Sequence, residues 1–588
     1  MLGKTKTLCI LALCLLFDGT QSLTTPRHES HLEPRTTTEP KYKAVAAAAQ
    51  KRRDDALNAF LPLPALNMTG IGNDLRPILL NSGVLTKSEI GIVQSDAATL
   101  VRKMIRGNLT SQEVTTAFCK ATVIAQNLTN CVTEVLFDEA LKRAKYVDDY
   151  FKRTGKPIGP LHGLPISLKD TFTTPPHPSS IGMAAYAIEP TTERSVIVDM
   201  LEDLGAVFYV KTNVPTAMLM GETINNVWGE TINPIHKHLT PGGSSGGEGA
   251  IAAMRASPLG VGTDIGGSIR IPGAYGHLYG LKPSLGRFPT WGSKPAIKGQ
   301  DIIYSISGPM SHSLPSIRLF AEAVLSEQAA PWLLDPKMNP MPWKRRVIPA
   351  DKKLKFGLLP CSDGIVTCHP PVERALKITA KALRDAGHEV VDWAPVNPAG
   401  VEGLTTQVFT LTGSDAVLPP LQAYDEPLLG VLKLLFPGGT NGPPELTPAK
   451  LRELILSRNQ LQKDMLDQWR ETNVDGIIGP VAVPAAARLQ MDPQKVYGGL
   501  TGFGNVMDLP GCSFPVTYAD KELDPKRGAD WVPNGERDAF VQSDYDADFW
   551  HGAPVGLQVL GQRLQEEKVL EMTEIIAAAI GFKDRVFG

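Results

Sequence analysis

The sequence has almost no net charge. Among its 588 residues, 59 Lys and Arg stand against 61 Asp and Glu, which gives a formal charge of -2. A protein that binds nucleic acid or an anionic membrane through charge carries a basic excess, so neither partner is expected. Hydrophobic residues make up 43% of the chain and charged residues 20%. That composition excludes a mostly disordered chain, because it supplies enough apolar surface for a large core.

Cysteine is also scarce, with seven residues in all, two of them among the first 22. The remaining five form an odd, scattered set that allows at most two disulfides and no disulfide framework. The spacings from Cys119 to Cys131 and from Cys361 to Cys368 are not those of a zinc knuckle. No HExxH motif occurs among the 11 His, so the sequence predicts neither a metal site nor a cofactor.

A hydrophobic run long enough to cross a membrane is missing as well. Lys4 and Lys6 precede an apolar run over residues 7–17 and a small-x-small ending before Leu23. This order predicts a secretory signal over residues 1–22, and the run is too short to span a bilayer comfortably. We expect a protein of the secretory pathway, secreted and without stable membrane association once the signal is removed. An uncleaved signal that anchors the chain is the alternative.

Residues 23–43 are rich in Thr, Pro and charge and lack apolar periodicity, which predicts a disordered linker. One catalytic domain is then expected over residues 44–588. Three sequons begin at Asn67, Asn108 and Asn127. They permit glycosylation if the chain enters the secretory route.

Strand and helix patterns alternate through the remaining sequence. Short apolar runs predict buried strands at 164–168, 206–210, 354–359, 389–393 and 476–479. Apolar residues at helical spacing, with capping residues such as Asp96 and the box Thr110 to Glu113, predict helices at 96–105, 110–125, 140–151, 196–204, 371–385, 448–471 and 565–580. The alternation indicates an α/β fold: a single large α/β/α domain with a mixed, mostly parallel sheet covered by helices on both faces.

Glycine and serine gather in two blocks, PGGSSGGEG over 241–249 and GTDIGGSIR over 262–270. A flexible linker would not alternate with apolar runs as these blocks do. A P-loop would need a Lys before Ser or Thr, where Glu248 and Ala250 stand instead. Residues 242–246 match G-x-S-x-G, the nucleophile elbow of α/β hydrolases, but the polar residues 236–241 before them do not predict the required strand.

These two blocks, with GLPISLKD over 163–170 upstream, resemble the amidase signature family, and within it the fungal acetamidase-type enzymes. The likeness runs from about residue 84 to about residue 580. It implies hydrolysis of a carboxamide to a carboxylate and ammonia or an amine through an acyl-serine intermediate. By this resemblance Ser268 is the nucleophile, Ser244 a bridging serine on a cis peptide bond, and Lys169 the general base.

The resemblance also assigns supporting roles. The backbone amides that it places in the oxyanion hole are those of Ile265, Gly266, Gly267 and Ser268. Ser245 is expected to support Lys169, and Asp264 and Arg270 to hold the loop through a salt bridge. Met218 is a candidate for lining the acyl pocket, with core filling as its alternative role.

The residue types suit this chemistry. A serine that attacks an amide must give its proton to a base, and a lysine can serve only when it is neutral. At an ordinary pKa of about 10.4, neutralising a lysine at pH 7 costs about 4.6 kcal/mol, and burial lowers a lysine pKa by roughly 3 to 5 units. Lys169 ends the apolar run 164–168, where burial is expected.

The expected partner is a small-molecule amide, with a homodimer left open. Two other functions remain as alternatives: an inactive binding scaffold, and an amidotransferase-type subunit that needs partner chains. The identity of the acyl group and of the amine is not predicted.

Overall fold

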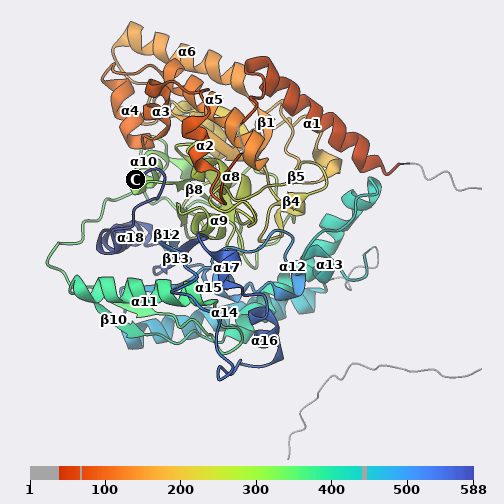
Figure 1. Ribbon diagram of the computed structural model, residues 1–588, viewed down its shortest axis with the longest axis vertical. Coiled ribbons are helices and arrows are strands. Elements are labelled where there is room, and N and C mark those ends of the chain that lie inside the picture. The colour runs from red at the N-terminus through yellow and green to blue at the C-terminus, as the bar shows by residue number, and fades with distance from the viewer. Residues whose placement is uncertain (1–38, 67–68, 440–445) are drawn as a thin grey trace, which may run out of the picture. The chain divides into compact units, whose positions relative to one another are not determined.

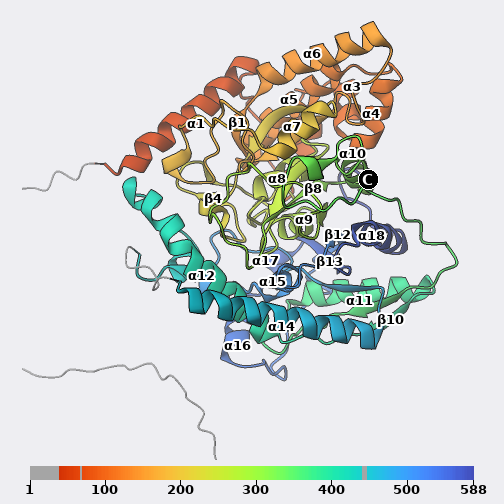
Figure 2. The ribbon, with the colours of Figure 1, turned by 180° about the vertical axis from the view of Figure 1, so that it is seen from behind.

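An eleven-stranded sheet forms the centre of the fold in the computed structural model (Figures 1 and 2). In spatial order its strands are β1 (Val132–Val135), β3 (Val207–Thr212), β2 (Pro165–Lys169), β6 (Gly260–Asp264), β8 (Ile306–Ser311), β7 (Tyr279–Lys282), β12 (Gly511–Tyr518), β13 (Pro554–Leu560), β11 (Gly476–Pro480), β9 (Lys355–Leu358) and β10 (Glu389–Asp392). A separate two-stranded sheet pairs β4 (Ile224–Asn225) with β5 (Gly229–Glu230).

The sheet is mixed, as the alternation of elements predicts. Parallel pairing joins β3, β2 and β6 into one block and β11, β9 and β10 into another. The pairs between these blocks, and the pair of β1 with β3, run antiparallel. In the block around β2, Leu168 lies opposite Lys211 of β3 and Val261 of β6. The end of β2 therefore lies between two strands whose residues are all buried.

Helices pack on both faces of the sheet and confirm the α/β fold. Figures 1 and 2 show α1 and α6 near the end of the sheet that starts with β1, and α11 and α14 near β10. The helices are α1 (Lys41–Phe60), α2 (Arg76–Asn81), α3 (Lys87–Val93), α4 (Ala97–Ile105), α5 (Ser111–Thr129), α6 (Phe137–Thr154), α7 (Val196–Asp203), α8 (Gly246–Ala253), α9 (Arg270–Tyr275), α10 (Leu314–Val324), α11 (Pro370–Asp385), α12 (Pro398–Ala423), α13 (Leu432–Leu435), α14 (Pro448–Thr472), α15 (Gly499–Val506), α16 (Glu536–Gln542), α17 (Ala547–Trp550) and α18 (Glu566–Ile580). Short 3-10 helices are η1 (Ala184–Tyr186), η2 (Thr216–Met218), η3 (Pro331–Leu333) and η4 (Pro493–Lys495).

Local sequence accounts for where several helices begin. Asp96 caps α4 by accepting from the Thr99 amide at 2.8 Å. Thr110 and Glu113 form the predicted capping box of α5, each side chain bonding the other's backbone amide. These bonds satisfy amides that the first helical turn leaves without a partner.

The structure describes residues 39–66, 69–439 and 446–588, and Pro40–Gly588 form one unit by themselves. The predicted signal over 1–22, most of the predicted linker and Asn67 lie outside the described residues. Helix α1 begins at Lys41, so regular structure starts just before the linker's predicted end at residue 43. Within the described part of the chain, no helix combines the length and apolarity that crossing a membrane requires.

Candidate active site

Lys169 ends β2 in the interior of the protein, with a fully buried side chain. Its Nζ donates to Ser244 Oγ at 2.8 Å and to Thr263 Oγ1 at 2.7 Å. Burial lowers the pKa of Lys169 to about 7, although the carboxylates of Asp264 and Glu248 act in the opposite direction. An amine with this pKa is about half neutral at pH 7 and can accept a proton.

Ser244 follows a cis peptide bond from Gly243. It lies just before α8, in a turn packed tightly against its neighbours. A Cβ on Gly243 would lie 2.4 Å from the carbonyl oxygen of Glu222, so only glycine fits this close approach. The turn places the Ser244 hydroxyl directly against the amine of Lys169.

Ser268 lies between β6 and α9 and lines a cavity that also touches Gly243. Its side chain is 7% exposed, and its carbonyl oxygen accepts from the Ser245 amide at 3.2 Å. This bond joins the two serine segments. Among the described residues, no hydrogen bond joins the Ser244 and Ser268 hydroxyls. The side-chain hydrogen bonds therefore connect Lys169 to Ser244 but do not continue to Ser268.

The loop between β6 and α9 contributes Ile265, Gly266 and Ser268 to the cavity lining. The amide of Gly267, predicted as an oxyanion donor, donates to Asp264 Oδ1 at 2.8 Å. In the part of the chain that the structure describes, no hydrogen bond is recorded from the amides of Ile265, Gly266 or Ser268. Of the four backbone amides predicted to form the oxyanion hole, the Gly267 amide has a partner in the protein. For the other three, the described residues supply none.

Asp264 and Arg270 form the predicted salt bridge, with Asp264 Oδ2 at 3.0 Å from Arg270 Nε. Both are fully buried, and the guanidinium lowers the pKa of Asp264 far below its ordinary value, although burial raises it. Arg270 also donates to Asn505 Oδ1 at 2.5 Å and to Gln558 Oε1 at 2.8 Å. The pair therefore fixes the loop to α15 and β13, two elements from the far end of the sequence.

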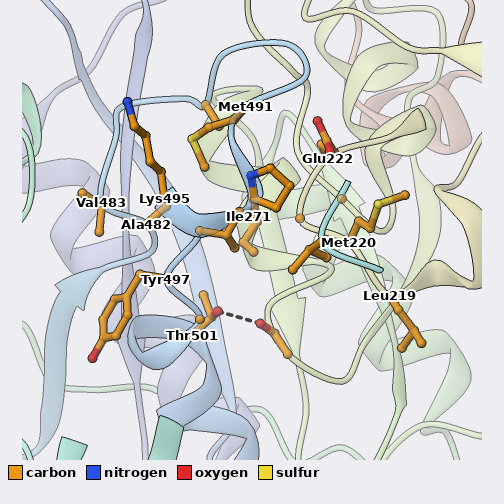
Figure 3. A pocket seen from close by; sticks show the side chains of 18 of the residues that line it. Leu219, Met220, Glu222, Ile271, Ala482, Val483, Met491, Lys495, Tyr497 and Thr501 are labelled. Carbon is orange, nitrogen blue, oxygen red and sulfur yellow. Dashed lines mark hydrogen bonds between the residues drawn. The ribbon is translucent and has the colours of Figure 1, made fainter. Parts of the chain in front are cut away.

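A further hydrogen bond joins the loop between β6 and α9 to helix α15. Thr501 Oγ1, on α15, donates to the carbonyl oxygen of Gly266 at 2.6 Å, marked by the dashed line in Figure 3. The sequence does not predict Thr501, Asn505 or Gln558 as part of this site, because no motif links them to the glycine blocks.

Ser245 supports Lys169 only through another residue. Its hydroxyl donates to the carbonyl oxygen of Thr263 at 3.3 Å and accepts from the Thr263 amide at 3.4 Å. Besides Ser244, the side chain that bonds Lys169 is that of Thr263, which the sequence analysis does not identify. The position of Thr263 within the glycine block 262–270 is the one sequence feature that links it to this site.

Glu248 is a second residue of this site that the sequence does not predict. It is fully buried in α8, accepts from Ser167 at 2.6 Å and from Thr212 at 2.7 Å. Burial raises its pKa to about 7, while these hydrogen bonds and the charge of Lys169 lower it.

The cavity has a volume of about 340 Å³ and mostly apolar walls. Figure 3 shows Leu219 and Met220 on one side of Ile271, and Ala482 and Val483 on the other. Met218 also lines the cavity and packs against an apolar cluster beside it, and its contact with the acyl group stays a prediction. Polar groups on the walls include Glu222, Lys495, Tyr497 and Thr501.

The remaining predicted sites lie away from this cavity. Asn108 is exposed after α4, and Asn127 is exposed on α5, where its side-chain amide donates to the Pro64 carbonyl at 3.0 Å. Within the described ranges, no three His, Cys, Asp or Glu side chains are placed to hold a metal ion.

Comparison with known proteins gives the family. The profile described as Amidase matches residues 113–570. An acetamidase of Emericella nidulans is 40% identical over 516 residues, which cover 85% of this chain and 92% of that enzyme. A putative amidase of Curvularia clavata is 36% identical, covering 92% of this chain and 98% of its own.

A solved structure of a fatty acid amide hydrolase superposes with a TM-score of 0.86 at 30% identity, over 94% of this chain and 98% of that one. These matches extend over most of the chain and agree with the resemblance carried by the sequence blocks 163–170, 241–249 and 262–270. The protein is therefore an amidase and belongs to the amidase signature family, whose members hydrolyse amides.

Proposed function

We propose that the protein cleaves a carboxamide through an acyl-Ser268 intermediate, with Ser244 and Lys169 relaying the proton. The observation that supports this most is the buried amine of Lys169, which has a pKa of about 7 and donates to Ser244 Oγ at 2.8 Å. Ser268 Oγ attacks the amide carbon, Ser244 accepts its proton, and Ser244 passes its own proton to neutral Lys169. The proton returns by the same route to the departing amine.

The developing oxyanion needs hydrogen-bond donors that have no other partner. The amides of Ile265, Gly266 and Ser268 suit this role, and losing one such donor typically costs about 3 to 4 kcal/mol of barrier. The Gly267 amide, which already donates to Asp264, instead fixes the loop. Water then attacks the acyl-serine, with Lys169 and Ser244 again accepting a proton, and the carboxylate leaves.

Labelling with a fluorophosphonate tests the nucleophile. We expect Ser268 to be labelled in the intact chain and Ser268→Ala to remove both labelling and turnover. If Ser244 were the nucleophile of an elbow, Ser244→Ala would remove labelling and Ser268→Ala would spare it. A folded chain without labelling would indicate an inactive scaffold, and activity that requires added partner chains would indicate an amidotransferase-type subunit.

The cavity supports an amide with a larger apolar group than that of acetamide. Its volume of about 340 Å³ falls in the range of about 300 to 1,000 Å³ that holds drug-sized ligands. Met218, Met220, Ile271 and Phe409 line it, and each methylene that they bury contributes about 0.8 kcal/mol. Acetamide, whose acyl group is a single methyl, would leave most of these walls without contact.

A series of amides of graded acyl length tests the substrate class. We expect kcat/KM to rise roughly fourfold per added methylene until the cavity is filled. Ala482→Phe, which narrows the cavity beside Ile271, should reduce the ratio of long-chain to acetamide turnover. A rate that is highest for acetamide and falls with every added carbon would contradict this substrate class while leaving the Ser268 mechanism intact.

We also propose that residues 1–22 direct the chain into the secretory route. The order of charged, apolar and small residues supports this, as do the exposed sequons at Asn108 and Asn127. Expression in a secreting host, followed by N-terminal sequencing and glycosidase treatment, tests it. We expect Leu23 as the new N-terminus and a mass loss on deglycosylation; an intact Met1 on a membrane-bound product would show the anchor instead.

A further inference from the structure

Cys361 and Cys368 lie opposite each other across a short hairpin between β9 and α11. Ser362 and Thr367 form an antiparallel bridge, and the Cys368 amide donates to the Cys361 carbonyl oxygen at 2.7 Å. The two cysteines thus occupy the pair of positions next to that bridge. Opposed residues that share such a bond have Cα atoms about 5.5 Å apart, within the range of about 4.4 to 6.8 Å that a disulfide needs.

Burial raises the pKa of the Cys368 thiol well above its ordinary value, and the neighbouring Cys361 thiol acts in the same direction. The other described cysteines lie elsewhere: Cys119 in α5, Cys131 two residues after the end of α5, and Cys512 in β12. The Cα separation expected of the opposed pair Cys361 and Cys368 suits a disulfide.

We propose that Cys361 and Cys368 are a redox pair that closes reversibly into a disulfide by exchange with a small-molecule or protein disulfide. Nothing in this step depends on the amidase mechanism proposed above. With oxidised glutathione, Cys361 sulfur attacks one glutathione sulfur and releases the first glutathione thiol. Cys368 sulfur then attacks Cys361 sulfur and releases the second. Two protein thiols are oxidised, one oxidant disulfide is reduced, and both thiol protons end on glutathione.

Exposure sets the order of these two attacks. Cys361 is half-buried and reachable from solvent, whereas Cys368 is fully buried. An external disulfide therefore meets Cys361 first, and Cys368 is placed to resolve the mixed disulfide because it lies opposite Cys361 across the hairpin. Since the pKa of Cys368 is raised, this second attack is the slower of the two.

The hairpin is connected to the substrate cavity. Between the two cysteines, Asp363 accepts a hydrogen bond from the hydroxyl of Tyr497, which lines the cavity. Thr367 donates from its amide to Asp538 Oδ1 at 2.9 Å. The neighbouring Arg537 pairs with Glu402 at 2.6 Å in the cavity wall. Closing the disulfide would restrict the loop that holds this wall.

Peptide mapping of the full-length folded protein tests the proposal directly. Trypsin releases one peptide, residues 356–374, that contains both cysteines and no other. After equilibration with oxidised glutathione and alkylation in denaturant, we expect this peptide unalkylated and lighter by two hydrogens. After dithiothreitol it should carry two alkyl groups. Two alkylated thiols after oxidation, a stable glutathione adduct, or a bridge to Cys119, Cys131 or Cys512 would each overturn the proposal.

A stability measurement gives a second readout. Oxidised protein should melt about 2 °C above reduced protein, because the bridge constrains the unfolded loop. Cys361→Ser should melt at the same temperature in both redox conditions. Cys512→Ser, the matched control in β12, should keep the redox-dependent shift if it folds. A shift that persists in Cys361→Ser would place the redox-sensitive bond elsewhere.

Discussion

Two lysines stand on neighbouring strands of the sheet, both fully buried, and their surroundings differ in one respect. Lys211 of β3 lies opposite Leu168, one residue from Lys169. Lys211 Nζ lies 3.3 Å from Asp170 Oδ1 and donates to Ser179 Oγ at 2.6 Å. Lys169 bonds hydroxyls and a carbonyl, and no carboxylate among the described residues pairs with it directly.

Burial lowers the pKa of both lysines, and for Lys211 the direct ion pair with Asp170 opposes this effect most. A carboxylate in contact holds a lysine in its charged form, whereas hydroxyl partners leave the neutral form accessible. Burial acts on both lysines, so the difference between them lies in their hydrogen-bond partners. We expect these partners to determine which of the two lysines can act as the base in the proposed mechanism.

The largest expected effect is the loss of activity in Lys169→Met. Without a base, the proton of Ser268 has no acceptor, and we expect kcat/KM to fall roughly 10,000-fold. Because Met fills a similar volume without a buried amine, the free energy of unfolding should change little or rise. Steady-state kinetics and urea denaturation measure the two quantities. An active Lys169→Met variant would remove the contrast between the two lysines.

Lys211→Met should show the opposite pattern. The change leaves the buried carboxylate of Asp170 without its cation, and breaking such a pair typically costs about 3 to 5 kcal/mol of stability. The fraction that remains folded should keep kcat/KM within a few-fold of the unmodified enzyme. Active-site titration, which counts folded molecules, separates the two effects. A loss of turnover per folded molecule as large as that of Lys169→Met would break the comparison.

The pH dependence of activity is a further test of the difference between Lys169 and Lys211. Lys169 must be neutral to accept a proton, and its pKa is about 7, so its protonated form dominates below pH 7. We expect kcat/KM to rise about tenfold per pH unit below pH 7 and to level off above about pH 8. A profile that stays flat from pH 6 to 9, with chemistry rate-limiting, would contradict this role of Lys169.

The smallest expected effect is that of Glu248→Gln. The Glu248 carboxylate raises the pKa of Lys169, so its removal should shift the inflection of the pH profile downward by less than about one pH unit. Glu426→Gln is the matched control, because burial likewise raises the pKa of Glu426 to about 7 while it bonds Ala184 and Asn226 instead. Equal shifts in both variants would exclude a specific Glu248 effect.

Much of the local structure followed from the sequence because its causes are local. The capping box Thr110–Glu113, the cap Asp96 and the apolar run 164–168 act within a few residues. The burial of Lys169 was predicted for the same reason, since it ends that run. The missed residues act over long sequence distances: Thr263 meets Lys169 94 positions away, and Thr501 meets Gly266 235 positions away.

The family, the α/β class and several helix starts could be predicted without a structure, because motifs and periodicity lie in short stretches of chain. The tertiary structure decided that Lys169 contacts Ser244 and Thr263, that the Gly267 amide belongs to Asp264, and that α15 and β13 hold Arg270. Those contacts join strands and helices that are distant along the chain, and only the packing of the sheet brings them within hydrogen-bonding distance.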